Sequence, residues 1–202
     1  MKAQVILFDA DGVLTLPEEV FSVVYAKSQG FDTEPFEQFF RNDWAEIVTG
    51  KKDLKQSILE NKELWRWNGN PEELLAYWFK TEDVRNDELL ELVGKLRAKG
   101  ILCYLATDQE KYRGQYMQNV MFRDLFDGYF ISANLGVTKT NPKFFEMVVE
   151  QLQQKYPELS PQDVTFFDDS QSKVDTACSV GINGQLYTNI KQVESLLVDS
   201  NR

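Results

Sequence analysis

The stretch VILFDADGVLT, residues 5–15, ends an apolar run with two aspartates two positions apart. Residues 5–8 predict a strand buried in a core, and the Asp-x-Asp-Gly that follows predicts a turn. Carboxylates this close repel each other, and each disfavours the ionisation of the other. A cation, a shared proton or exposure to water has to offset that cost.

Short apolar runs of this kind recur along the chain and alternate with helical patterns. They predict strands, and they cover residues 4–8, 101–107, 128–134, 164–170 and 184–188. Residues 86–100 carry a stripe of leucines at helical spacing, and residues 141–156 begin with Asn and Pro, as helices often do. Strands alternating with helices predict an α/β fold, a Rossmann-like parallel sheet flanked by helices.

The segment 15–87 breaks this alternation. It has no convincing strand, it holds all four tryptophans, and its apolar residues recur at helical spacing. We therefore predict a small all-helical domain at 15–87, inserted into an α/β core domain of residues 1–14 and 88–202 that carries the catalytic motifs. We expect the large aromatic side chains of the insertion to form its own hydrophobic core and not a surface that binds a ligand.

Composition limits the classes of partner. The chain has 202 residues, 43% of them hydrophobic, and a formal net charge of −10. Such acidity argues against binding of nucleic acid or of an anionic membrane surface. No apolar run approaches the roughly 20 residues that a membrane span needs, and the N-terminus lacks the pattern of a signal peptide. We expect a cytoplasmic protein, a monomer or homodimer, whose partner is a small molecule.

The chain contains no histidine. This excludes histidine as a general base, Ser-His-Asp triads and His-ligated zinc, and two isolated cysteines cannot hold zinc either. Cys103 and Cys178 lie in apparently buried segments and are expected to be buried free thiols. Catalysis therefore has to use carboxylates, hydroxyls, lysine, arginine or a metal bound by oxygen atoms.

Polar side chains follow several of the predicted strands. Ligands of parallel sheets gather beyond the carboxyl ends of the strands, so these side chains are expected to meet in one site. The first strand ends in an Asp pair, the second in Thr-Asp and the fourth in another Asp pair, and a lysine precedes the helix after the third. The candidates are Asp9, Asp11, Thr107, Asp108, Lys139, Asp168 and Asp169.

Each candidate has a simpler explanation when it is taken alone. The first Asp pair could be a solvated turn, and the pair at 168–169 could cap a helix. Thr107 could be an ordinary β-branched strand residue, and Lys139 could be a solvated surface charge. The order and spacing of all four pieces favour a common site.

The same four pieces resemble the four motifs of the haloacid dehalogenase superfamily: FDADGVLT, LATD, KTNPKFF and FFDDSQSKVDTACSVGI. The helical insertion resembles the cap of the dehalogenase-like and epoxide-hydrolase-phosphatase-like branch. The resemblance implies a Mg²⁺-dependent phosphatase that hydrolyses a small phosphomonoester, such as a sugar phosphate or a nucleotide-like metabolite, through an aspartyl-phosphate. The cation would offset the repulsion between the carboxylates and the phosphate.

The resemblance also implies roles for the first aspartate pair. Asp9 would be the nucleophile and a metal ligand. Asp11 would protonate the leaving alkoxide, then take a proton from the attacking water, and its backbone carbonyl would bind the metal.

The other motif residues are implied to bind the phosphoryl group and the metal. Thr107, Asp108 and Lys139 would contact the substrate, with Lys139 supplying positive charge in the transition state. Asp169 would be the direct metal ligand, and Asp168 would orient Lys139 or a metal-bound water.

Two residues depart from the family pattern. Thr140 stands where proline is usual, and Lys173 stands where asparagine is common. Neither occupies a position that is expected to do chemistry. The two departures therefore affect the assignment of the subfamily and of its substrate, and not that of the reaction. The open alternatives are a phosphotransferase or mutase, a dehalogenase, and a non-enzymatic phospho-acceptor or regulatory protein. Asp11 disfavours the dehalogenase, and the Asp pair at the start of the chain disfavours a signalling receiver domain.

Overall fold

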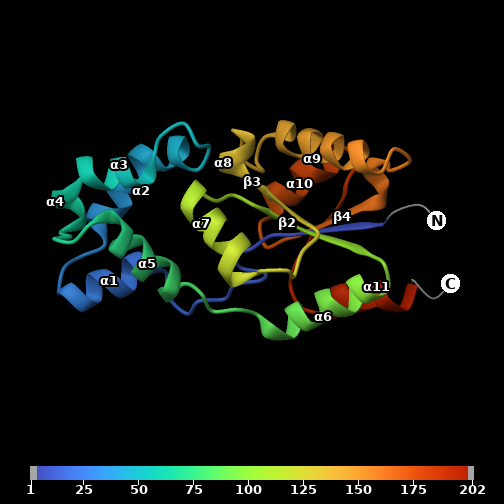
Figure 1. Cartoon of the computed structure of the whole chain (residues 1–202), viewed down its shortest axis with the longest axis horizontal. Coiled ribbons are helices and arrows are strands. Elements are labelled where there is room, and N and C mark those ends of the chain that lie inside the picture. Colours follow the sequence, from blue (N-terminus) through green and yellow to red (C-terminus); the bar gives the residue numbers. More distant parts are fainter. Residues whose placement is uncertain (1–3, 200–202) are drawn as a thin grey trace.

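The computed structural model describes residues 4–199, and in this part of the chain five parallel strands form one sheet in the order β3-β2-β1-β4-β5 (Figure 1). The strands are β1 (Val5–Phe8), β2 (Leu102–Thr107), β3 (Gly128–Ile131), β4 (Val164–Asp168) and β5 (Asn183–Leu186). The predicted Rossmann-like α/β class is confirmed. The third strand ends earlier than expected, because a short helix, α8 (Ser132–Leu135), starts directly after it.

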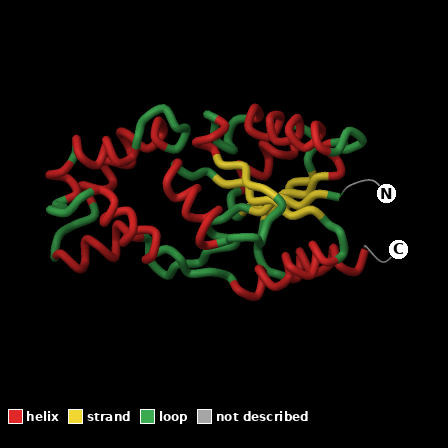
Figure 2. Tube along the Cα trace, in the orientation of Figure 1, coloured by secondary structure: helices red, strands yellow, loops and turns green. Residues whose placement is uncertain are grey.

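Helices cover both faces of the sheet (Figure 2). They are α6 (Asp87–Ala98) and α11 (Lys191–Asp199) on one face, and α9 (Pro142–Lys155) and α10 (Gln171–Ser179) on the other. The central strand β1 divides its side chains between two apolar layers: Ile6 and Phe8 pack with α6, and Val5 and Leu7 pack with α9. All four side chains are fully buried, which is why this strand has no polar alternation.

Several shorter segments connect these elements. Helix α7 (Lys111–Tyr116) follows β2 and continues as a wider π-helical turn at Met117–Met121, and a 3-10 turn at Pro161–Asp163 precedes β4. The start of α9 follows the sequence prediction: the Asn141 side chain accepts a hydrogen bond from the Lys143 N–H, and Pro142 is the first helical residue.

The segment between β1 and α6 contains helices and no strand, and its helices lie to one side of the sheet (Figure 1). Its helices are α1 (Phe21–Gln29), α2 (Glu34–Ile47), α3 (Leu54–Glu60), α4 (Lys62–Trp65) and α5 (Pro71–Thr81). They enclose an apolar cluster of their own, in which Trp65 and Trp78 are buried and Trp44 and Trp67 are partly buried. The division into domains at 15–87 stays a prediction.

The two chain segments that join the helical segment to the sheet run side by side. The Leu16 N–H donates to the Val84 carbonyl (2.8 Å), and the Asn86 N–H donates to the Leu14 carbonyl (2.9 Å). A further contact lies at the carboxyl edge of the sheet, where the Ser132 hydroxyl donates to the Val48 carbonyl (2.7 Å). The helical segment is therefore fastened over the edge where the polar strand ends meet.

Among the described residues, no helix combines the length and the apolar character needed to cross a membrane.

The two cysteines differ in exposure. Cys103 is fully buried in β2, and this burial together with the nearby charge of Asp127 raises the pKa of its thiol to about 12. Cys178 is exposed, so the expectation that both thiols are buried is wrong for this residue. Helix α10 buries Val174 and Ala177 against the sheet, and Cys178 lies beside that face.

We expect one thiol per chain to react rapidly with Ellman's reagent in the native protein and two after unfolding in denaturant. Cys103 has neither access to the reagent nor the thiolate form that reacts. A Cys178→Ser variant should lose the rapid reaction, and a Cys103→Ser variant should keep it. Rapid reaction of both thiols in the folded protein would contradict this assignment.

Candidate active site

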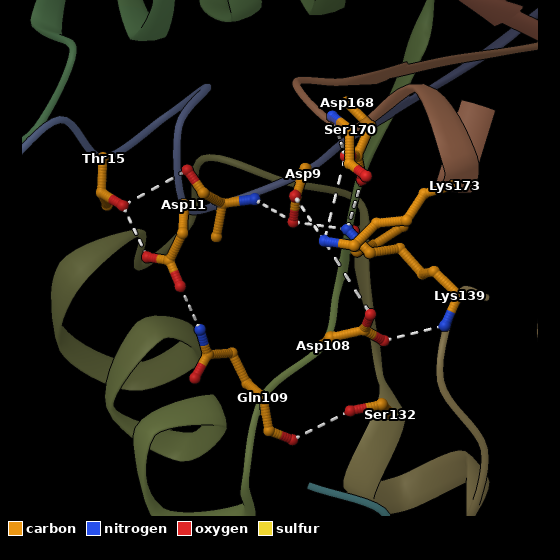
Figure 3. A network of polar contacts seen from close by, with 12 residues as sticks. Asp9, Asp11, Thr15, Asp108, Gln109, Ser132, Lys139, Asp168, Ser170 and Lys173 are labelled. Carbon is orange, nitrogen blue, oxygen red and sulfur yellow. Dashed lines mark hydrogen bonds and ion pairs between the residues drawn. The ribbon is translucent and has the colours of Figure 1, made fainter. Parts of the chain in front are cut away.

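Asp9 is the first residue after β1, and its side chain is buried (Figure 3). Its Oδ1 accepts a hydrogen bond from the Ala10 N–H (2.7 Å) and lies 2.6 Å from Nζ of Lys139. Burial by itself raises the pKa of Asp9, but the charges of Lys139 and Lys173 outweigh it and hold this pKa below its ordinary value. Asp9 is therefore an ionised and oriented carboxylate.

Lys139 is fully buried, which rules out a solvated surface charge. Its Nζ lies 2.6 Å from both Oδ1 of Asp9 and Oδ2 of Asp168, and it donates to the Ala106 carbonyl (3.1 Å). Burial by itself lowers the pKa of Lys139, but the neighbouring carboxylates reverse the effect and raise it to about 12. The buried ammonium therefore stays charged at neutral pH and links the ends of β1 and β4.

The second aspartate pair divides between two environments. Asp168 ends β4 fully buried, with its Oδ2 bound to Lys139 and its Oδ1 accepting from the Ser170 N–H (2.8 Å). Burial and the charge of Asp9 raise the pKa of Asp168 to about 7, against the opposing effect of Lys139. Asp169 is exposed. The choice of Asp169 over Asp168 as the direct metal ligand stays a prediction.

Oxygen atoms of Asp9, Asp168 and Asp169 lie within 4.8 Å of one another, in a group that could hold a metal ion. Carboxylate oxygens are the ligands that Mg²⁺ prefers, so the donor set fits this ion.

Thr107 and Asp108 lie at the end of β2. Thr107 is the last residue of the strand and is buried. The Oδ1 of Asp108 accepts the backbone N–H of Lys139 (2.9 Å), and so fixes the loop that carries this lysine. Burial raises the pKa of Asp108, with Lys139 acting in the opposite direction. The structure thus gives Asp108 a positioning contact in addition to its predicted contact with substrate.

Asp11 directs its carboxylate toward Thr15 and Gln109 (Figure 3). The Thr15 hydroxyl donates to Oδ1 (2.8 Å), and the Gln109 side-chain amide donates to Oδ2. The Arg113 guanidinium binds both oxygens, at 2.8 Å and 3.3 Å. Asp11 therefore lies two residues after Asp9 in the chain, while its side chain is held by partners of its own.

The sequence pattern predicts no chemical role for Lys173, but the structure places its ammonium among the carboxylates of the site. Its Nζ lies 3.7 Å from Oδ2 of Asp9, 3.9 Å from Oδ2 of Asp108 and 3.9 Å from Oδ1 of Asp168 (Figure 3). A lysine in the first turn of the helix after the Asp168–Asp169 pair was the available signal. Thr140, in contrast, is exposed and contacts the Thr138 hydroxyl.

A buried ion pair joins Asp11 to the helical segment, and no sequence motif indicated it. Arg113 on α7 pairs with Glu82 at the end of α5 (2.8 Å), and both side chains are 7% exposed. The second oxygen of Glu82 accepts the N–H of Phe21 at the start of α1 (2.8 Å). Arg113 therefore holds Asp11 on one side and two helices of the insertion on the other.

A family model described as "Hydrolase: haloacid dehalogenase-like hydrolase" matches residues 3–181. The chain belongs to the haloacid dehalogenase-like hydrolase family. The resemblance inferred from the four motifs is thereby confirmed.

Solved structures of family members share the fold. A HAD family enzyme from Bacteroides thetaiotaomicron superposes with a TM-score of 0.78 at 17% identity, over 98% of this chain and 99% of that one. Its complex with magnesium and inorganic phosphate gives a TM-score of 0.76 at 20% identity, over 92% and 94%. L-2-haloacid dehalogenase from Xanthobacter autotrophicus, with chloropropionic acid covalently bound, gives 0.60 at 16% identity, over 89% and 75%.

Among curated proteins, the chain is similar to the sesquiterpene phosphatase astK of Aspergillus oryzae, with 29% identity over 102 residues. The match covers half of this chain and half of the length of that relative.

Removing one partner of the Arg113–Glu82 pair should strongly destabilise the protein. We expect Arg113→Met to lower the free energy of unfolding by roughly 3–5 kcal/mol, because Glu82 is left buried without its partner. Adding Glu82→Gln to this variant should restore part of the loss. Urea unfolding of the two single variants and the double variant measures both effects. Arg41→Met, which removes an exposed ion pair with Glu34, is the control and should cost less than about 1 kcal/mol. Strictly additive effects of the two substitutions would contradict the coupling.

Glu110 should make stability depend on pH. It caps α7 by accepting the N–H groups of Tyr112 and Arg113, and burial raises its pKa to about 7 despite these bonds. A carboxyl with a raised folded-state pKa stabilises the protein at low pH and loses that contribution as pH rises toward 7. The stability of Glu110→Gln relative to the parent should therefore increase between about pH 4.5 and 7.5, as measured by urea unfolding across that range. A difference independent of pH would contradict the raised pKa of Glu110 in the folded protein.

Proposed function

We propose that this chain is a Mg²⁺-dependent phosphomonoesterase that hydrolyses a small phosphomonoester through an aspartyl-phosphate on Asp9. The observation that carries the proposal is the group of three carboxylates within 4.8 Å, on two neighbouring strand ends, beside the buried ammonium of Lys139. Carboxylate oxygens suit Mg²⁺, and a buried cation suits a phosphoryl group. The magnesium- and phosphate-bound neighbour and the phosphatase relative support the same reaction class.

In this proposal Asp9 attacks phosphorus. Its carboxylate forms a bond to the phosphorus atom, the bond from phosphorus to the alcohol oxygen breaks, and water later hydrolyses the acyl phosphate. The Ala10 N–H and Lys139 orient the carboxylate for this attack. Lys139 and Lys173 supply positive charge next to the transferred phosphoryl group, and Thr107 contributes its hydroxyl. When bound, Mg²⁺ neutralises charge between the carboxylates and the phosphate.

Asp11 is proposed to protonate the leaving alkoxide and then to accept a proton from the attacking water. Its carboxylate is engaged by Thr15, Gln109 and Arg113, so at least one of these contacts has to give way to the leaving oxygen. The need for this proton separates the proposal from carbon–halogen cleavage, because a halide leaves without one. A phosphotransferase or mutase would share the first step and differ in the acceptor.

The substrate is proposed to be a small phosphorylated metabolite. The sequence suggests a sugar phosphate or a nucleotide-like compound. The residues that line the cavity beside Asp11 determine which compounds can bind.

The proposal is tested with p-nitrophenyl phosphate. We expect hydrolysis that requires added Mg²⁺ and stops in excess chelator, and we expect Asp9→Asn to reduce kcat by roughly a thousandfold or more because the nucleophile is lost. Circular dichroism checks that the variant is folded. Asp175→Asn, an exposed carboxylate on α10, is the matched control and should leave kcat unchanged. Full activity in the presence of chelator, or in Asp9→Asn, would refute the mechanism.

A further inference from the structure

A cavity of about 590 Å³ lies between the loop after β1 and the helices of the insertion. Asp11 and Gly12 line it on the side of the sheet, and residues of α1, α2 and α5 line it on the opposite side. The cavity borders the cluster formed by Asp9, Asp168 and Asp169. Gly12, which lines the cavity, lies so close to Asp169 that a Cβ atom on it would overlap the Asp169 carboxylate. The volume of the cavity is that of an ordinary small-molecule site. A phosphomonoester held at Asp9 would place its alcohol portion here, next to Asp11.

The rest of the cavity lining is largely apolar. Leu16 and Val20 are among the exposed large aliphatic residues of the described chain, at 47% and 51% exposure. Phe40, Trp44 and Trp78 continue the wall, with ring centroids 5.2 Å apart for Phe40 and Trp44, and 6.0 Å apart for the two tryptophans. We call these five residues the apolar wall. Covering such surface with an apolar ligand removes it from water and favours binding.

The charged groups around the cavity already bind one another. Among the described residues that line it, Arg113 is the single lysine or arginine, and its guanidinium is bound to Asp11 and Glu82. Glu82 in turn binds Arg113 and the Phe21 N–H. No free cation is therefore offered to a second phosphate or to a carboxylate of the substrate, which disfavours nucleoside diphosphates and phosphorylated acids.

Hydroxyl groups of a substrate would find few partners. Apart from the charged groups, the polar side-chain groups that line the cavity are the hydroxyls of Thr15 and Ser22 and the indole N–H groups of Trp44 and Trp78. The Thr15 hydroxyl already donates to Asp11, and the Trp78 N–H is buried. A sugar would lose water from several hydroxyls without replacing those hydrogen bonds, at a cost of about 1–3 kcal/mol for each group left unpaired. The cavity therefore favours an alcohol that carries few polar groups beyond its phosphate ester.

We propose that the substrate is the phosphomonoester of an apolar alcohol, aliphatic or aromatic, whose hydrocarbon portion packs on the apolar wall while its ester oxygen faces Asp11. This inference rests on the proposed function for the position of the phosphoryl group. It replaces the sugar phosphate or nucleotide suggested by the sequence with a hydrophobic class of ester.

Binding of alkylphosphonates, which cannot be hydrolysed, tests the inference without requiring turnover. In calorimetric titrations with Mg²⁺, we expect hexylphosphonate to bind at least ~30-fold more tightly than ethylphosphonate. A buried CH₂ group adds about 0.8 kcal/mol, which is about a fourfold gain for each carbon. In parallel, hexyl phosphate should be hydrolysed with a kcat/KM at least ~10-fold above that of glucose 6-phosphate or AMP.

The variant Leu16→Ser/Val20→Ser locates the effect. Both side chains are exposed, and serine is favourable at Val20, which caps α1, so the fold is kept. The ratio of the affinities for hexyl- and ethylphosphonate should fall about tenfold. Leu59→Ser, an exposed leucine of α3 outside the cavity, is the control and should leave this ratio unchanged.

The outcomes separate the two proposals. Equal affinity for the two phosphonates, or a ratio that the double variant leaves intact, overturns the apolar-alcohol inference even if p-nitrophenyl phosphate is hydrolysed. A preference for hexylphosphonate that depends on Leu16 and Val20, without hydrolysis of any phosphate ester, supports the apolar site and refutes the phosphatase.

Discussion

The buried ammonium of Lys139 is the contact on which the candidate site depends. It lies 2.6 Å from one oxygen of Asp9 and 2.6 Å from one oxygen of Asp168, at the ends of adjacent strands. Without that charge, two carboxylates would be buried side by side, and each would oppose the ionisation of the other. The charges of the first Asp pair are thus offset within the chain, because Lys139 binds Asp9 and Arg113 binds Asp11. The proposed Mg²⁺ would be a further cation beside Lys139 and Lys173, and Asp9, Asp168 and Asp169 would be the carboxylates available to hold it.

The sequence predicted the parts of the molecule that depend on local pattern and on chain order. Short continuous apolar runs such as Val5–Phe8, bounded by turn residues, favour strands buried on both faces, and all four side chains of this run are buried. The polar residues that follow these runs have to meet, because all strands are parallel and end at one edge. Asp9, Lys139 and Asp168 could be brought together by this argument alone.

Other contacts could not be predicted because they depend on how helices pack. Arg113 approaches Asp11 from α7, and Glu82 reaches Arg113 from the far end of the insertion, although no spacing in the chain relates these residues. The exposure of Cys178 depends on the rotation of α10 about its own axis, which a short apolar run does not fix. Lys173 lies within the fourth motif, but the direction in which its side chain points depends on the same rotation of α10.

The paired connections at Leu16–Val84 and Leu14–Asn86 also bear on how the chain folds. β1 pairs with β2 only after the whole helical segment has intervened, so closing this contact from an open chain carries the entropy cost of a long loop. Once the aromatic cluster of the helical segment has packed, the two ends of the segment lie close enough for Leu16 to form a hydrogen bond with Val84. The loop that remains to be closed is then short. If the helices of the insertion pack first, the pairing of β1 with β2 costs less loop-closure entropy.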